Sequence, residues 1–153
     1  MSAPPSLPSR QLELYLEGRA YRPAVELARR AFPGRVVRLE ARWGDWLVEQ
    51  KRVDQAINHY IEAGEHEKAI RAALDSAQWA KAAQLVEDTL NGDVAKPYYM
   101  RIASHYRDKR RYDLAERYFV KAGKPNEAVD MYTRANKWEA AHRVAVRFMS
   151  ENE

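Results

Sequence analysis

The chain has 153 residues, a net charge of +4 and no cysteine. This length suits one domain of ordinary size, and the lack of cysteine excludes disulfides, thiolate metal sites and cysteine nucleophiles. No apolar stretch approaches the ~18 residues that a membrane-spanning helix needs, and the first ten residues lack the apolar region of a signal peptide. The mild positive charge permits attraction to acidic proteins or acidic lipids. It is too evenly spread to indicate a dedicated nucleic-acid binder.

In chain order, residues 1–10 are rich in Pro and Ser and are predicted to form a flexible leader, followed by a helical repeat segment over 11–153. Apolar residues recur at helical spacing, and no strand pattern competes with them. The predicted helices lie near residues 11–19, 21–32, 36–51, 53–63, 66–76, 79–90, 96–109, 112–122, 125–135 and 138–150. The predicted turns fall at Pro33-Gly34, Gly64, Asn91-Gly92-Asp93, Gly123 and Asn136-Lys137.

The helix predicted over 53–63 shows the pattern that repeats along the chain. Ala56, Tyr60 and Ala63 are spaced by four and three residues and therefore share one helix face. Small residues at such positions let a neighbouring helix come close, and the aromatic residue between them fills the space above. Gly64 follows where a helix can end in a left-handed cap.

An internal repeat is found when residues 43–86 are placed over 102–145, a shift of 59. Small residues then fall on small residues and aromatic residues on aromatic residues, as with Tyr60 on Phe119 and Trp79 on Trp138. A repeat of this kind indicates stacked supersecondary units. The predicted repeat core comprises Ala24, Ala56, Tyr60, Ala63, Gly64, Trp79, Ala82, Ala115, Phe119, Ala122, Gly123, Ala128, Tyr132, Trp138 and Ala141.

The repeat is unequal. Its leading small residues are separated by 32, 26, 33 and 26 residues, and they are Ala24, Ala56, Ala82, Ala115 and Ala141. The longer steps approach the ~34-residue TPR period, while the shorter steps equal two thirteen-residue helices with their turns. We therefore predict an all-α fold, an α-solenoid of about five stacked antiparallel helical hairpins in which long and short units alternate.

A search for catalytic or metal chemistry yields no candidate residues. His59 and His66 lie seven residues apart with acidic residues nearby, but the cap at Gly64 places them on different helices. No His-Glu-x-x-His motif occurs, and no two glycines have the spacing of a phosphate-binding loop. The sequence therefore predicts a protein that is not an enzyme, with no cofactor, no metal site and no small-molecule substrate.

Basic clusters are the sharpest charge features. One cluster lies at the end of a predicted helix, where the helix dipole favours cations, and comprises Arg107, Lys109, Arg110 and Arg111. The same four residues form a candidate interaction surface for an acidic partner or an anionic membrane. A second basic region has the same two interpretations and comprises Arg29, Arg30, Arg35, Arg38 and Arg42. Nucleic acid is not an expected partner, because the aromatic residues occupy predicted core positions.

Two stretches resemble a known family, "ARWGDWLVEQKRVDQAINHYIEAGEHEKAIRAAL" (41–74) and "RRYDLAERYFVKAGKPNEAVDMYTRANKWEAAHRVA" (110–145). They are similar to the TPR-like helical tail of the large peripheral subunit of intraflagellar-transport complex B, which carries two WD40 propellers before a long solenoid. The chain has no propeller repeats, so the resemblance implies a fragment of such a subunit. It also implies a non-enzymatic scaffold in the trains that motors carry along the cilium.

Four classes of function therefore compete. The first is a scaffold and docking segment in the cilium or flagellum, basal body and cytoplasm, with other intraflagellar-transport subunits as partners and with motor, cargo or anionic membrane as further candidates. The second is a membrane-binding or vesicle-coat-like solenoid module, which the basic clusters suggest. A peptide-binding co-chaperone module and an enzyme are the third and fourth, and neither finds support in the motifs.

Overall fold

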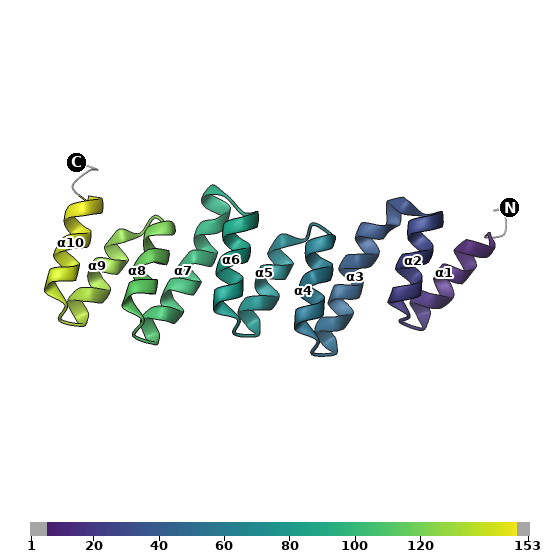
Figure 1. Ribbon diagram of the computed structural model, residues 1–153, viewed down its shortest axis with the longest axis horizontal. Coiled ribbons are helices and arrows are strands. Elements are labelled where there is room, and N and C mark those ends of the chain that lie inside the picture. The colour runs from purple at the N-terminus through teal and green to yellow at the C-terminus, as the bar shows by residue number, and fades with distance from the viewer. Residues whose placement is uncertain (1–5, 150–153) are drawn as a thin grey trace. The chain divides into compact units, whose positions relative to one another are not determined.

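The computed structural model describes residues 6–149, and this part of the chain is entirely helical apart from turns (Figure 1). The helices are α1 (Leu7–Glu17), α2 (Tyr21–Ala31), the 3-10 helix η1 (Pro33–Arg35), α3 (Val36–Glu49), α4 (Val53–Glu62), α5 (His66–Asp75), α6 (Trp79–Thr89), α7 (Gly92–Asp108), α8 (Tyr112–Lys121), α9 (Pro125–Arg134) and α10 (Trp138–Met149). No strand occurs between residues 6 and 149. The prediction of an all-α fold of stacked helices is confirmed.

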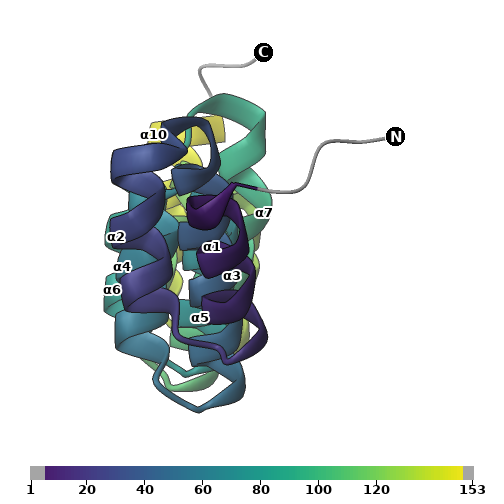
Figure 2. The ribbon, with the colours of Figure 1, turned by 90° about the vertical axis from the view of Figure 1, so that its right-hand side faces the viewer.

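The chain divides between Gln78 and Trp79 into two compact units. Unit 1 contains α1 to α5, and each of these helices from α1 to α4 packs against the next one along the chain. Successive helices run in alternating directions (Figure 1), and Figure 2 shows α1, α3 and α5 on one side of the unit with α2 and α4 on the other. The unit is thus a two-layer stack of antiparallel helices.

A close helix contact defines the middle of unit 1. Gly44 of α3 faces the ring of Tyr60 in α4, and a Cβ atom added at Gly44 would lie 2.7 Å from Cε1 of Tyr60. Tyr60 is itself buried, as are Ala56 and Leu47 beside it in the same two helices. The small residue therefore lets α3 and α4 approach closely, and the aromatic ring fills the interface.

Unit 2 contains α6 to α10, again with each helix packed against its successor. Its core contains the fully buried Phe119 of α8, the position that corresponds to Tyr60 in the sequence repeat. Ala103 of α7 belongs to the same cluster and corresponds to Gly44. The two units therefore build the same interface with different residues, a Gly–Tyr contact in one and an Ala–Phe pair in the other.

Most residues of the predicted repeat core are buried. The small residues with buried side chains are Ala24, Ala56, Ala63, Ala82, Ala115, Ala122, Ala128 and Ala141, and the buried aromatic residues among the predicted set are Tyr60, Phe119 and Tyr132. Gly64 and Gly123 are exposed in turns, where φ is +74° and +73°. At these two positions a residue with a Cβ atom would be strained, so the glycines act as helix caps and contribute nothing to the core.

The two tryptophans that match in the repeat have different environments. Trp79 of α6 is half-buried, and its ring stacks on His105 of α7 at a centroid distance of 4.0 Å and an interplanar angle of 8°. Trp138 of α10 is 62% exposed among residues 6–149, unlike its counterpart, and its predicted place in the repeat core stays a prediction. The physical reason is that no helix within residues 6–149 lies after α10 to cover the ring, as α7 follows α6 to cover Trp79.

The turns within helical pairs repeat a backbone conformation. Arg19, Lys51, Ala77, Arg110 and Asn136 all have positive φ, between 55° and 62°, and each precedes a leading small residue of the repeat by five positions. In each turn the following amide donates a hydrogen bond back to the helix, as Arg52 N does to the carbonyl of Leu47 at 2.8 Å. Three of the five positions carry Arg or Lys, which adopt this conformation less readily than Gly or Asn.

Two helix starts differ from the prediction. Residues 7–10 of the predicted leader belong to α1, because Ser6 caps the helix by accepting a hydrogen bond from the Ser9 amide and Pro8 occupies the first turn. Residues 1–5 lie outside the described part of the chain. Helix α7 begins at Gly92 and contains Pro97, although the sequence predicted a start near 96. The five residues of α7 before Pro97 are helical despite the restriction that proline places on its predecessor.

Candidate functional site

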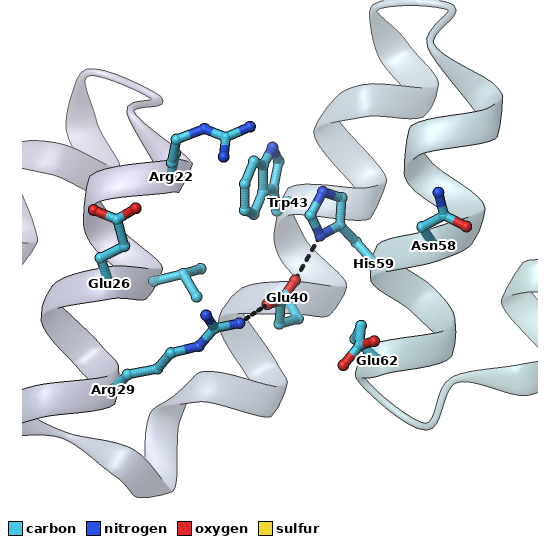
Figure 3. A pocket seen from close by; sticks show the side chains of 9 residues that line it. Arg22, Glu26, Arg29, Glu40, Trp43, Asn58, His59 and Glu62 are labelled. Atoms are coloured by element: carbon cyan, nitrogen blue, oxygen red, sulfur yellow. Dashed lines mark hydrogen bonds and ion pairs between the residues drawn. The ribbon is translucent and has the colours of Figure 1, made fainter.

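The most enclosed polar cluster of unit 1 surrounds Glu40, which lies on α3 and is only 3% exposed (Figure 3). Arg29 of α2 donates a hydrogen bond from Nη2 to one carboxylate oxygen at 3.1 Å, and His59 Nδ1 of α4 lies 2.6 Å from the other. An ionised carboxylate only accepts hydrogen bonds, so with Glu40 ionised the Nδ1 atom of His59 is the donor. Burying an unpaired carboxylate would be strongly unfavourable, and these two partners hold α2, α3 and α4 together through Glu40.

A pocket of about 220 Å³ lies above this cluster. Figure 3 shows Trp43 between Arg22 and His59. The Trp43 ring stacks on the His59 imidazole at 3.8 Å, and the Arg22 guanidinium lies 5.6 Å from the ring centroid. The residues that line the pocket include no Ser, Thr or Cys that could act as a nucleophile beside His59. The pocket can hold a small polar group, but its contacts fit helix packing better than catalysis.

Unit 2 carries tyrosines at the positions that correspond to this cluster. In the sequence repeat Tyr99 falls on Glu40 and Tyr118 on His59, and their rings stack at a centroid distance of 6.0 Å. Lys121 lies over both rings, 5.7 and 5.9 Å from their centroids. Burial raises the pKa of the Tyr99 hydroxyl. The same place between helices therefore accepts either a charged cluster or an aromatic one, which indicates a packing role.

A second polar network lies in unit 2 and joins the buried Tyr132, the partly buried Glu116 and the exposed Arg143. The Tyr132 hydroxyl donates to Glu116 at 2.7 Å, and Arg143 donates to both carboxylate oxygens at 2.6 and 3.3 Å. Burial alone would raise the pKa of Glu116, but the hydrogen bonds from Arg143 and Tyr132 outweigh it and hold that pKa below its usual value. The network joins α8, α9 and α10 and is structural.

The hydroxyl of Tyr60 is hydrogen-bonded to a carboxylate, as that of Tyr132 is. It donates to Asp45 Oδ1 at 2.6 Å, and Lys68 Nζ lies 3.5 Å from the same oxygen. Burial raises the pKa of Tyr60 well above its usual value, and the hydrogen bond to the Asp45 carboxylate raises it further. Tyr60 therefore stays neutral and fixes the orientation of Asp45 beside α5.

The basic run that the sequence singled out lies at the end of α7 and in the turn to α8. Arg107 is half-buried, with its guanidinium carbon 5.8 Å from the Phe119 ring centroid and Nε 3.4 Å from Asp108. Lys109, Arg110 and Arg111 are exposed in the turn. The structure therefore brings three of the four predicted surface residues to one edge of unit 2, while Arg107 packs along the helix.

His59 and His66, which lie seven residues apart in the sequence, do not form a metal site together. His59 lies on α4 with Glu40, whereas His66 begins α5 after the turn at Gly64. Within residues 6–149 no group of three or more His, Cys, Asp or Glu side chains is placed to hold a metal ion. No helix in the same part of the chain is long and apolar enough to cross a membrane.

Sequence reasoning missed the Glu40 cluster because its members are separated by 11 and 19 residues. The sequence did contain one indication of this cluster. Glu40 lies four residues before Gly44 on α3, on the face that the small residue turns toward α4, and a charged residue on a packed face requires partners.

These features define a class of protein. The antiparallel helices stack through small residues, and polar networks link neighbouring helices. This arrangement is typical of a helical-repeat protein of the α-solenoid type. No protein-family model matches the chain.

Individual relatives are much more informative. The chain is 50% identical over 145 residues to intraflagellar transport protein 172 of Chlamydomonas reinhardtii, a match that covers 95% of this chain. It is 48% identical over 142 residues to the homologue from Homo sapiens, and 42% identical over 137 residues to intraflagellar transport protein osm-1 of Caenorhabditis elegans. The chain spans only 8% of the length of these relatives. It belongs, as one segment, to the family of intraflagellar transport protein 172, in agreement with the resemblance seen in the sequence.

Proposed function

We propose that this chain is a non-enzymatic scaffold and docking segment of an intraflagellar-transport subunit, acting in the cilium or flagellum and at the basal body and in the cytoplasm, where transport begins. The observation that carries the proposal is the match over 95% of the chain to proteins named for intraflagellar transport. Other subunits of the transport assembly are the partners.

The surface of the chain supports a docking role. Its helices bury small and aromatic residues and leave long charged side chains on exposed faces. Repeat proteins of this kind use such extended faces to bind other proteins. Motors and cargo would be reached through the assembly, and Lys109, Arg110 and Arg111 form one candidate contact for an acidic partner surface.

Affinity capture tests the proposal. The tagged 153-residue chain is incubated with an extract of isolated flagella from Chlamydomonas reinhardtii, and the retained proteins are identified by mass spectrometry. The matched control carries Ala56→Asp and Ala115→Asp, which place charges at fully buried positions and disrupt both units.

Retention of intraflagellar-transport subunits by the folded chain and not by the control is the expected result. If the folded chain retains no transport subunit above the control, the proposal is wrong for this segment.

A further inference from the structure

The structure divides the basic region of residues 29–42 between two faces of unit 1. Arg29 pairs with Glu40 in the pocket between α2, α3 and α4. Arg38 and Arg42 lie on another face of α3, where both line a groove of about 470 Å³ that reaches α5. Neither side chain forms an ion pair or hydrogen bond with any residue between 6 and 149, and both are exposed.

Two helices line this groove. Val37, Arg38, Ala41 and Arg42 form its α3 wall, and Lys68 of α5 lies on the other side. A second hollow of about 220 Å³ shares Arg42 and Asp45 with it and is lined by Arg19 in the turn between α1 and α2. The main groove has the volume of an ordinary ligand site, and the shared lining residues make the second hollow its neighbour.

Three basic and two acidic residues line the main groove, so its net charge is positive, while Arg19 and Glu49 in the second hollow balance each other. Asp45 also lines the main groove, but that carboxylate already accepts the Tyr60 hydroxyl at 2.6 Å and lies 3.5 Å from Lys68 Nζ. Glu65 is at the far end, at the start of α5. Arg38 and Arg42 are therefore the two charges that remain unengaged in the middle of the groove.

Packing does not dictate Arg38 or Lys68. When the 59-residue shift is applied, Arg38 falls on Pro97 and Lys68 on Glu127, whereas Arg42 falls on Arg101 and the interface residue Gly44 on the small residue Ala103. Arg42 thus keeps its residue type between the two copies, while Arg38 and Lys68 do not. The combination of Arg38, Arg42 and Lys68 occurs in unit 1 and is absent from the matching positions of unit 2.

We propose that this groove binds an acidic peptide segment of a partner protein in an extended conformation. Arg38 and Arg42 are one helical turn apart, about 6 Å along the axis, and alternate side chains of an extended chain are spaced by about 7 Å. Two carboxylates at alternate positions of the peptide can therefore each meet one guanidinium in a charge-assisted pair. Val37, which is 56% exposed, and Ala41 offer an apolar strip for the peptide's aliphatic atoms.

A peptide fits this site better than an anionic membrane. The two guanidiniums line a recess between helices, and a flat lipid surface engages protruding clusters most readily. The inference rests on the proposed docking function and names the chemistry of one partner contact.

The test uses the whole 153-residue chain and a rhodamine-labelled decapeptide in which Glu and Ala alternate, with binding followed by fluorescence anisotropy at 50 mM NaCl. The same peptide with Gln in place of Glu is the ligand control. R38E/R42E is the test variant. R117E/R134E is the matched control, because it makes the same change in charge at exposed arginines of unit 2 that belong to neither candidate binding surface.

The expected result is saturable binding of the Glu peptide, no binding of the Gln peptide, and a loss of at least about tenfold in affinity in R38E/R42E but not in R117E/R134E. R38Q/R42Q should show an intermediate loss, and circular dichroism should show unchanged helicity in all variants. Absence of binding, or an equal loss in both Glu variants, overturns the inference. So does pelleting of the chain with phosphatidylserine vesicles through Arg38 and Arg42 when the peptide does not bind.

The result of the peptide-binding experiment can be distinguished from the result of the affinity-capture experiment that tests the proposed function. If the chain retains transport subunits but the Glu peptide does not bind, only the groove assignment fails. If the peptide binds through Arg38 and Arg42 but no transport subunit is retained, the groove stands and the transport role of this segment fails.

Discussion

Gly44→Ala is the substitution that examines the helix contact of unit 1 most closely. Gly44 lies inside α3, and a methyl group at this position would meet Cε1 and Cδ1 of Tyr60 at 2.7 and 2.8 Å. Those distances are too short for carbon atoms, so the ring or the helix must shift. The ring cannot shift freely, because its hydroxyl is held by Asp45 at 2.6 Å.

The expected change in unfolding free energy for Gly44→Ala is the sum of opposing effects. Replacing glycine by alanine inside a free helix stabilises it by about 1 kcal/mol. Overpacking a closely packed interface costs about 1–3 kcal/mol, and weakening the Tyr60–Asp45 hydrogen bond adds about 1 kcal/mol. We expect Gly44→Ala to lower the free energy of unfolding by about 1–3 kcal/mol, the opposite sign to the effect of helix propensity alone.

Urea unfolding followed by circular dichroism measures this change. A double-mutant cycle with Tyr60→Phe gives the physical reason, since the phenylalanine ring is released from Asp45 and reproduces the Ala103 and Phe119 pair of unit 2. Gly44→Ala should therefore cost about 1 kcal/mol less in the Tyr60→Phe background. An increase in stability on Gly44→Ala in the otherwise native chain would refute the close contact.

Four further predictions follow from other contacts. Ala115→Leu, at a fully buried position of α8, should cost about 1–3 kcal/mol of unfolding free energy, and an unchanged urea midpoint would show that this face is not closely packed. Arg29→Ala should cost about 1–2 kcal/mol because it removes a partner of the buried Glu40, while Arg30→Ala, its exposed neighbour, should stay within about 0.5 kcal/mol; equal effects in urea unfolding would contradict the pairing. Gly123→Ala should cost about 1 kcal/mol because φ is +73°, and a neutral melt would argue against that turn. The pKa of Glu116 is lower in the folded chain than in the unfolded one, so its network stabilises the fold above the ordinary glutamate pKa of 4.5, and this stabilisation is lost as the pH falls through the folded-state value. Glu116→Gln should therefore reduce the loss of unfolding free energy at acid pH. Parallel plots of unfolding free energy against pH for the two proteins would count against the network.

Much of the fold could be predicted because its signals are local. Ala56, Tyr60 and Ala63 show helical spacing within eight residues, and the turn glycines mark helix ends at Gly64 and Gly123. The 59-residue repeat then extends these local signals to both units. The described helices match the predicted ones closely except at the starts of α1 and α7.

The polar contacts could not be predicted because they join residues far apart in sequence. Glu40 meets Arg29 and His59 only after α2, α3 and α4 have packed, and no spacing rule relates the three. Repeat equivalence also did not show that Trp138 is exposed among residues 6–149 while Trp79 stacks on His105, since a matching position in sequence does not guarantee a matching neighbour. The same limit applies to the α3 groove, whose arginines the sequence identified as basic without showing which of them remain unpaired.

Photo-crosslinking in the complete protein tests the functional account most directly. A benzoylphenylalanine at Val37, which is exposed in the α3 groove, is introduced into a full-length intraflagellar-transport subunit that carries this segment, with the same probe at Lys109 for comparison. The account predicts that illumination of flagella joins the Val37 probe to an acidic segment of another transport subunit, and that R38E/R42E abolishes this product. Crosslinks from Lys109 alone would contradict the groove assignment, and the absence of crosslinks from both positions would contradict the docking function itself.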